Sequence, residues 1–103
     1  MDRITIIGVG PIGASIGLGL MRRNLRDTEV VVSSGSRTVL KDVARIGAAD
    51  QTIAGLRTAV TGARLVVLDA SVGEVPELLE AIGPILDDGA VVTDTSAIKA
   101  PVL

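Results

Sequence analysis

The chain has 103 residues, a formal net charge of −2, 48% hydrophobic residues and 21% charged residues. This length fits one domain, and the composition is typical of a soluble globular protein without an apolar run long enough to span a membrane. The charge balance provides no basic face for nucleic acid, so we expect neither nucleic acid nor a membrane as a partner. Asp2 and Arg3 interrupt the beginning of the chain, which excludes a signal peptide there and makes the cytoplasm the default location.

The sequence contains no His, no Cys and no aromatic residue. It therefore lacks the side chains most often used for proton transfer near neutral pH and for thiolate chemistry. It also lacks a stacking platform for bases. We expect no complete catalytic apparatus, no catalytic residue and no metal site within these residues.

Short apolar runs rich in β-branched residues alternate with helical patterns. In chain order, the predicted elements are a strand at Ile4–Ile7, a helix at Ile12–Leu20, a strand at Val30–Val32, a helix at Val39–Ile46 ended by Gly47, a poorly marked strand near Ala48–Ile53, a short helix at Leu56–Ala63, a strand at Leu65–Leu68, a helix at Val75–Leu86 interrupted at Pro84, a turn at Asp87–Gly89 and a strand at Val91–Thr93. Continuous apolar runs are typical of parallel strands covered on both faces. The pattern predicts an α/β fold with a doubly wound parallel sheet.

The first turn of this pattern is rich in glycine. Gly8, Gly10 and Gly13 follow the first strand and open the first helix, with Pro11 and Ile12 between the last two glycines. In this context, the G-x-G-x-x-G spacing is typical of a loop that holds a dinucleotide diphosphate at a helix N-terminus. We expect Gly8 to form the tight turn, Gly10 to let the backbone approach the diphosphate, and Gly13 to let the helix lie close to the sheet. The alternative is a turn that needs small residues only for packing.

The residues after the second strand indicate which dinucleotide is bound. NAD-binding domains have an Asp or Glu about 20 residues beyond the glycine loop, where it binds the ribose hydroxyls. This chain has Ser34 there, which does not repel a 2′-phosphate as an acid would. Ser36 can donate a hydrogen bond to that phosphate, and Arg37 can neutralise it. NADP(H) is therefore favoured over NAD(H). Ser36 is also expected to cap the helix that begins at Arg37, which is compatible with phosphate binding.

Ligands of open α/β sheets bind outside the carboxyl ends of the strands. Ala70 and Ser71 follow the fourth predicted strand and are further candidate cofactor contacts. Asp69 precedes them, and we expect its carboxylate to lie near the cofactor phosphates and repel them, with no compensating partner evident. For Ser15, in the first helix, two roles stay open: contact with the diphosphate or a hydrogen bond within the helix.

The last strand is followed by a polar segment that ends with a helical pattern. Asp94 is a candidate cofactor contact, and Ser96 and Lys99 are candidate supporting residues for catalysis. Asp94, Thr95 and Ser96 are also residue types that cap helices. The pattern over Ser96–Leu103 resembles the beginning of a helix, which indicates a truncated domain; a frayed natural C-terminus is the alternative.

Taken in order, several segments resemble the N-terminal nucleotide-binding domain of the prephenate/arogenate dehydrogenases, the oxidoreductases of tyrosine biosynthesis. The matching segments are Ile4–Gly17, Leu65–Leu68, Val72-Gly73, Pro76–Leu79, and Val91–Asp94 with Lys99. The resemblance implies a Rossmann-like NAD(P)-binding domain over residues 1–103. It also implies oxidative decarboxylation of prephenate or arogenate, with hydride transfer to NAD(P)+. A following all-helical domain would contain the catalytic His and form a homodimer, so the fragment alone would be inactive.

The chain departs from that family at several positions. The family has an acid in place of Ser34, Thr-Pro in place of Ala70-Ser71, and a small apolar residue in place of Asp69. Ala97 stands where the family has the Ser that supports the catalytic His, and Ser96 comes one residue early, a rotation of about 100° on a helix. Two alternatives stay open. One is a β-hydroxyacid dehydrogenase or a pyrroline-carboxylate/F420-type reductase; the other is a nucleotide-binding module without chemistry.

Overall fold

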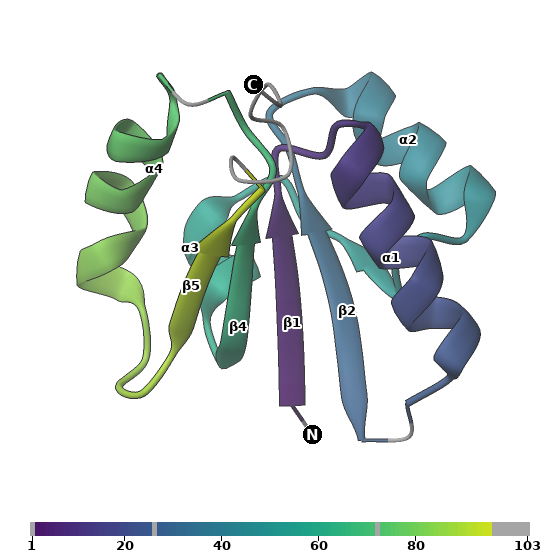
Figure 1. The fold of residues 1–103 in the computed structure, drawn as a ribbon, viewed down its shortest axis with the longest axis horizontal. Coiled ribbons are helices and arrows are strands. Elements are labelled where there is room, and N and C mark those ends of the chain that lie inside the picture. Colours follow the sequence, from purple (N-terminus) through teal and green to yellow (C-terminus); the bar gives the residue numbers. More distant parts are fainter. Residues whose placement is uncertain (1, 26, 72, 96–103) are drawn as a thin grey trace, which may run out of the picture.

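The structure, a computed structural model, describes residues 2–25, 27–71 and 73–95. These residues form a five-stranded sheet in the order β3-β2-β1-β4-β5, in which all paired strands are parallel (Figure 1). The elements are β1 (Asp2–Ile7), α1 (Pro11–Arg23), β2 (Thr28–Ser33), α2 (Arg37–Ile46), β3 (Gln51–Thr52), α3 (Leu56–Val60), β4 (Ala63–Leu68), α4 (Val75–Ile82), the 3-10 turn η1 (Gly83–Ile85) and β5 (Val91–Asp94). The helix expected from Ser96 onward lies outside the described residues.

The chain winds outward from β1 in both directions. It first adds β2 and β3 on one side of β1, and then crosses to add β4 and β5 on the other side. Ile4 of β1 lies opposite Val30 of β2 and Leu65 of β4. The carboxyl ends of β1 and β4 are therefore the point where the winding reverses, which is where open α/β sheets bind ligands. The predicted doubly wound sheet is confirmed, including the poorly marked strand β3.

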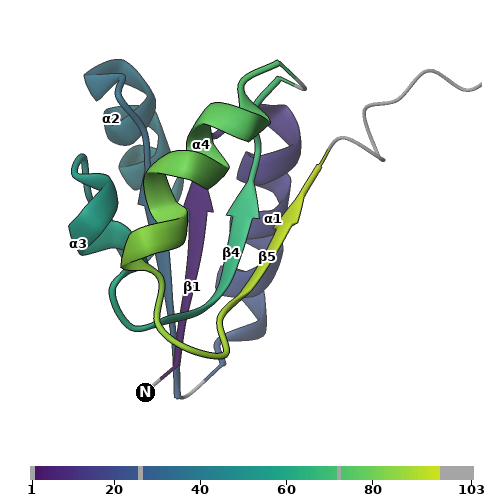
Figure 2. The same ribbon diagram turned by 90° about the vertical axis from the view of Figure 1, so that its left-hand side faces the viewer.

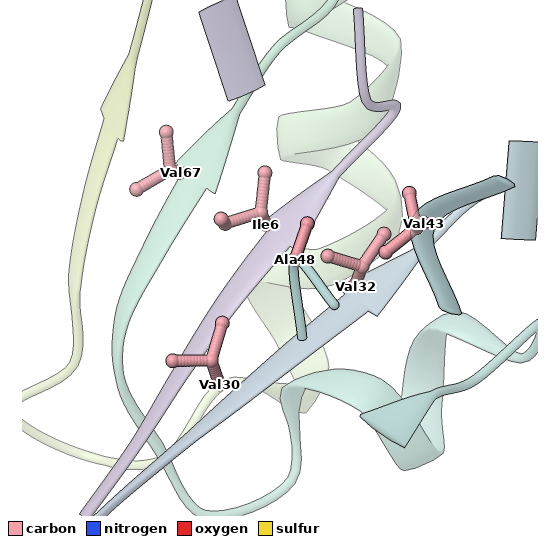
Figure 3. Packing of buried hydrophobic residues seen from close by; sticks show 6 residues of the cluster. All are labelled: Ile6, Val30, Val32, Val43, Ala48 and Val67. Carbon is pink, nitrogen blue, oxygen red and sulfur yellow. The ribbon is translucent and has the colours of Figure 1, made fainter. Parts of the chain in front are cut away.

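Helices cover both faces of the sheet. Figure 2 shows α1 and α3 on opposite sides of the strands. Alternate residues of each strand supply the two cores, because successive side chains of a strand point to opposite faces. The core under α1 and α2 is shown in Figure 3 and contains Ile6, Val30, Val32, Val43, Ala48 and Val67. The core under α3 and α4 contains Ile7, Val60, Ala63, Val66, Leu68 and Ile82. Burial on both faces explains the continuous apolar runs.

The ends of α2 and α4 follow the sequence signals. Ser36 caps α2, since its Oγ accepts a hydrogen bond from the N–H of Val39 at 3.3 Å. Gly47 ends the same helix with a φ of 72°, a conformation that favours glycine. At the end of α4, the chain tightens into η1 at Pro84, as expected for a residue without an N–H donor.

The third helix is shorter than predicted. The prediction placed Ala63 in this helix, but α3 ends at Val60, and Ala63 is the first residue of β4. Gly62 separates the two elements with a φ of 77°, a conformation that favours glycine. The prediction was wrong because Ala63 continues the apolar spacing of α3 while packing against the same core from the adjoining strand.

Candidate dinucleotide-binding site

A cavity of about 450 Å³ opens at the carboxyl edge of the sheet. Its lining includes three residues that the sequence indicated, Gly8, Ser34 and Ala70. Ser33, at the end of β2, and Glu74, just before α4, also line it. The volume lies within the range of about 300–1,000 Å³ that is usual for small-molecule sites. The structure therefore brings the ends of β1, β2 and β4 together around one cavity.

Gly8 forms the tight turn that the sequence predicted. Its φ is 87°, in the region that L side chains rarely adopt. A Cβ atom at this position would lie 3.0 Å from the carbonyl oxygen of Asp69. The N–H of Gly8 donates to the carbonyl oxygen of Ser33 at 2.8 Å, so the turn is tied to both neighbouring strands.

The Asp69 carboxylate lies against the glycine loop. The side chain is only 2% exposed, and its Oδ2 accepts hydrogen bonds from the N–H of Gly10 at 2.7 Å and from that of Gly13 at 2.6 Å. Its Oδ1 accepts a third bond from the hydroxyl of Thr95 at 2.9 Å. The expectation that Asp69 has no compensating partner is therefore wrong. The main partners are backbone donors, which every non-proline residue carries and which leave no trace in the composition.

The close approach of Asp69 accounts for two of the glycines. A Cβ atom on Gly13 would lie 2.5 Å from Asp69 Oδ2 and 3.0 Å from Asp69 Cβ, so a side chain there collides with both. The expected close packing of this helix on the sheet is thus confirmed. A Cβ atom on Gly10 would lie 3.3 Å from Asp69 Oδ2. Gly10 therefore lets the backbone approach this carboxylate, whereas the sequence assigned that freedom to the diphosphate.

The start of α1 leaves one donor for an anionic ligand. Pro11 is the first helical residue and has no N–H group. Gly13 donates to Asp69, and α1 has neither a side-chain cap nor an acidic residue in its first turn. Among the described residues, the N–H of Ile12 has no hydrogen-bond acceptor. Ser15 donates to the carbonyl oxygen of Pro11 at 3.0 Å, which is the second of its two open roles.

The start of α2 carries an arginine and no acid. Ser34 Oγ accepts a hydrogen bond from the N–H of Ser36 at 3.1 Å, which fixes the turn between β2 and α2. Arg37 is exposed in the first turn of α2, and no acidic residue lies in that turn. In the described part of the chain, Arg37 forms no ion pair. A cation at the positive end of a helix is unfavourable on its own, so this arrangement suits an anion held from outside.

The remaining predicted residues are spread along the same edge. Ser71 follows β4, and its hydroxyl donates to Glu74 Oε1 at 2.8 Å. Asp94 is the last residue of β5 and pairs in register with Leu68. The hydroxyl of Thr95 donates to Asp69 Oδ1 at 2.9 Å. Ser96 and Lys99, the candidate supporting residues, lie outside the described residues, as does Ala97.

Two polar residues of the cavity, Glu74 and Ser33, are not among the cofactor contacts predicted from the sequence. Ser71 and Glu74 have the Ser-x-x-Glu spacing of a capping box, a signal that could have drawn attention to Glu74. Ser33 is fully buried, and its hydroxyl has no hydrogen-bond partner within the described chain. A buried hydroxyl without a partner is costly and unusual. No sequence signal distinguishes it from an ordinary serine at the end of a strand.

Residues 3–98 of the chain match the family model described as NADP oxidoreductase, coenzyme F420-dependent. The chain belongs to this family. None of the curated protein sequences compared with it matches.

Several solved structures have a fold similar to that of this chain. An arogenate dehydrogenase from Synechocystis is 26% identical, with a TM-score of 0.80 over 89% of this chain and 32% of that chain. A prephenate dehydrogenase from A. aeolicus, in complex with hydroxyphenyl propionate and NAD+, is 21% identical, with a TM-score of 0.80 over 92% of this chain and 33% of that one. An imine reductase from Bacillus cereus is 18% identical, with a TM-score of 0.71 over 91% of this chain and 31% of that chain.

The chain thus spans about a third of the length of these structures. Below 25% identity, the likeness shows the fold alone. Together with the family model, these structures confirm the Rossmann-like fold and the resemblance to prephenate/arogenate dehydrogenases. The family and the fold are those of a nucleotide-binding domain of NAD(P)-dependent oxidoreductases.

The described residues contain no cluster of three His, Cys, Asp or Glu side chains that could hold a metal ion. None of the described helices has the length and apolarity needed to cross a bilayer. The cavity, whose lining includes Ser33, and the start of α2 both lie at the carboxyl edge of the sheet, where open α/β sheets bind ligands.

Proposed function

We propose that this domain binds NADP(H) in preference to NAD(H). The observation that carries the proposal is the start of α2, where exposed Arg37 lies at the positive end of the helix with no acid in the first turn. Ser34, Ser36 and Arg37 would hold the 2′-phosphate, because a guanidinium and a helix N-terminus both favour a phosphate dianion. When bound, the nicotinamide accepts or donates a hydride.

The other predicted residues would contact the diphosphate and the nicotinamide half of the dinucleotide. The turn at Gly8 and the N–H of Ile12 would receive the diphosphate, since that N–H is the first-turn donor left over in α1. Ala70, Ser71 and Asp94 follow β4 and end β5, so they would lie toward the nicotinamide half. The small-molecule dinucleotide is the partner that this domain would recognise by itself.

For the whole protein, we propose oxidative decarboxylation of prephenate or arogenate with hydride transfer to NAD(P)+, a step of tyrosine biosynthesis. The structural likeness to dehydrogenases of both substrates supports this reaction. A following helical domain would supply the catalytic His and form a homodimer, in the cytoplasm. The second candidate is a reductase that exchanges hydride between NADP and coenzyme F420, which the description of the family model favours.

Direct binding tests the cofactor proposal. NADPH fluorescence can be titrated without background from the protein, since the chain has no aromatic residue. We expect NADPH to bind more tightly than NADH. Arg37→Ala should weaken NADPH binding about tenfold or more, because a charge-assisted hydrogen bond contributes about 1.5–3 kcal/mol, and should leave NADH binding unchanged. Arg23→Ala, an exposed arginine in the last turn of α1, is the matched control.

Equal affinity for the two dinucleotides, or an equal effect of both arginine variants, would contradict the assignment of the 2′-phosphate site. Assays of the full-length protein with prephenate, arogenate and reduced F420 separate the two candidate reactions. The domain alone should turn over neither prephenate nor arogenate. Measurable turnover by the domain would show that its catalytic groups lie within these residues.

A further inference from the structure

The glycine loop of this domain already binds an anion that belongs to the chain. Asp69 Oδ2 lies 2.7 Å from the nitrogen of Gly10 and 2.6 Å from that of Gly13. These are two of the backbone donors that a helix N-terminus offers to an anion. The positive end of a helix is equivalent to roughly half an elementary charge, so a carboxylate placed there more than offsets it.

The position of Asp69 makes this charge hard to screen. The side chain is 2% exposed, and it comes from the end of β4, whereas its partners lie in the loop between β1 and α1. The hydroxyl of Thr95, beyond β5, donates to the other carboxylate oxygen at 2.9 Å. The carboxylate therefore ties together three segments of the ligand-binding edge. Buried charges are screened less by salt and water than exposed ones.

We propose that Asp69 sets the dinucleotide affinity of this site. Its hydrogen bonds hold the loop in the binding conformation, while its charge opposes the diphosphate at the same helix end. Binding is therefore weaker than the loop geometry alone would give. This inference rests on the proposed binding of NADP(H) and concerns a residue that the proposed contacts do not include.

Asp69→Asn separates the charge of this residue from its shape. The amide oxygen of Asn can accept from the N–H groups of Gly10 and Gly13, and its NH₂ group can donate to the hydroxyl oxygen of Thr95. The hydrogen bonds can thus be kept while the charge is removed. Asp87→Asn is the matched control, because Asp87 Oδ2 also accepts a bond from a glycine N–H, that of Gly62 at 3.0 Å. Gly62 lies before β4, at the opposite edge of the sheet.

The experiment is a titration of wild type, D69N and D87N with NADPH and NADH at low and high salt. We expect D69N to bind NADPH about tenfold more tightly than wild type, since like charges repel strongly in a partly buried site. The difference should shrink as salt rises. D87N should bind like wild type. Amide resonances of Gly10 and Gly13 report whether the loop of D69N keeps its hydrogen bonds.

Affinity equal to or below that of wild type, in a D69N variant whose two amide resonances are kept, would overturn the inference and leave the proposed function intact. If wild type and D69N bind neither dinucleotide, the proposed function fails, and the inference fails with it. Should D69N not fold, Asp69→Ala decides. It removes the charge together with the hydrogen bonds that hold the loop, so its NADPH affinity should fall more steeply with rising salt than that of wild type, and an equal or weaker salt dependence overturns the inference.

Discussion

Replacing Gly13 with alanine tests the contact between the glycine loop and Asp69. In an open helix, this change stabilises by up to about 1 kcal/mol, because alanine has the higher helix propensity. Here the new Cβ would lie 2.5 Å from Asp69 Oδ2 and 3.0 Å from Asp69 Cβ. The carboxylate must then leave the N–H of Gly13, and a hydrogen bond to a charged group contributes about 1.5–3 kcal/mol. Adding overpacking of about 1–3 kcal/mol and subtracting the gain in helix propensity, we expect Gly13→Ala to destabilise the fold by about 2–5 kcal/mol.

The same substitution in an Asp69→Ala background measures how much of this cost comes from the contact between the new methyl group and the Asp69 carboxylate. The carboxylate oxygens are then absent, and only the Cβ atom of residue 69 remains close to the new methyl group. The cost of Gly13→Ala should fall to about 1 kcal/mol or less, which gives a coupling energy of about 2 kcal/mol. Urea unfolding followed by far-UV circular dichroism measures all four proteins, since the chain has no aromatic probe. Equal costs in the two backgrounds would refute the idea that Asp69 is what requires glycine at this position.

Two further predictions concern α1 and the cofactor. Gly17→Ala should lower the free energy of unfolding by about 1–3 kcal/mol, because its Cβ would collide with the carbonyl oxygen of Ala48. Gly19 faces open space on the same helix, so Gly19→Ala should raise the free energy of unfolding by about 0.5–1 kcal/mol in the same urea assay. If both substitutions change the free energy of unfolding in the same direction, the packing of α1 described here is contradicted. Ser34→Asp should weaken NADPH binding about tenfold while NADH binding holds or improves, whereas equal losses for the two dinucleotides would argue against a 2′-phosphate at this position.

The fold was largely predictable because its signals are local. Val30–Val32 and Leu65–Leu68 are short apolar runs buried on both faces, and that burial produces the pattern from which they were recognised. Gly47 and Pro84 act through their own backbone chemistry, so each marks a helix end without reference to its neighbours. The error at Ala63 arose because an apolar residue next to a helix fits the spacing of that helix and the first position of a strand equally well.

The candidate site was predictable only in part. The turn at Gly8 and the cap at Ser36 depend on residues adjacent in the sequence, and both are confirmed. The bonds from Gly10 and Gly13 to Asp69 join residues 59 and 56 positions apart, and their donors are backbone groups. The chain pattern carries no sign of such a contact. It depends on β4 lying beside β1, which follows only from the strand order.

The glycine spacing and the ligand are separate questions in this domain. Gly13 must be glycine to admit Asp69 whether or not a dinucleotide is bound, because the collision is with the protein's own side chain. The G-x-G-x-x-G pattern is therefore compatible both with a loop that binds a nucleotide and with one that binds only this carboxylate. Arg37 differs in this respect, since nothing in the described chain offsets a cation at the positive end of α2. Dinucleotide binding by Arg37 variants thus tests which ligand is bound, whereas the stability of Asp69 variants tests how strongly the loop is held when no ligand is bound.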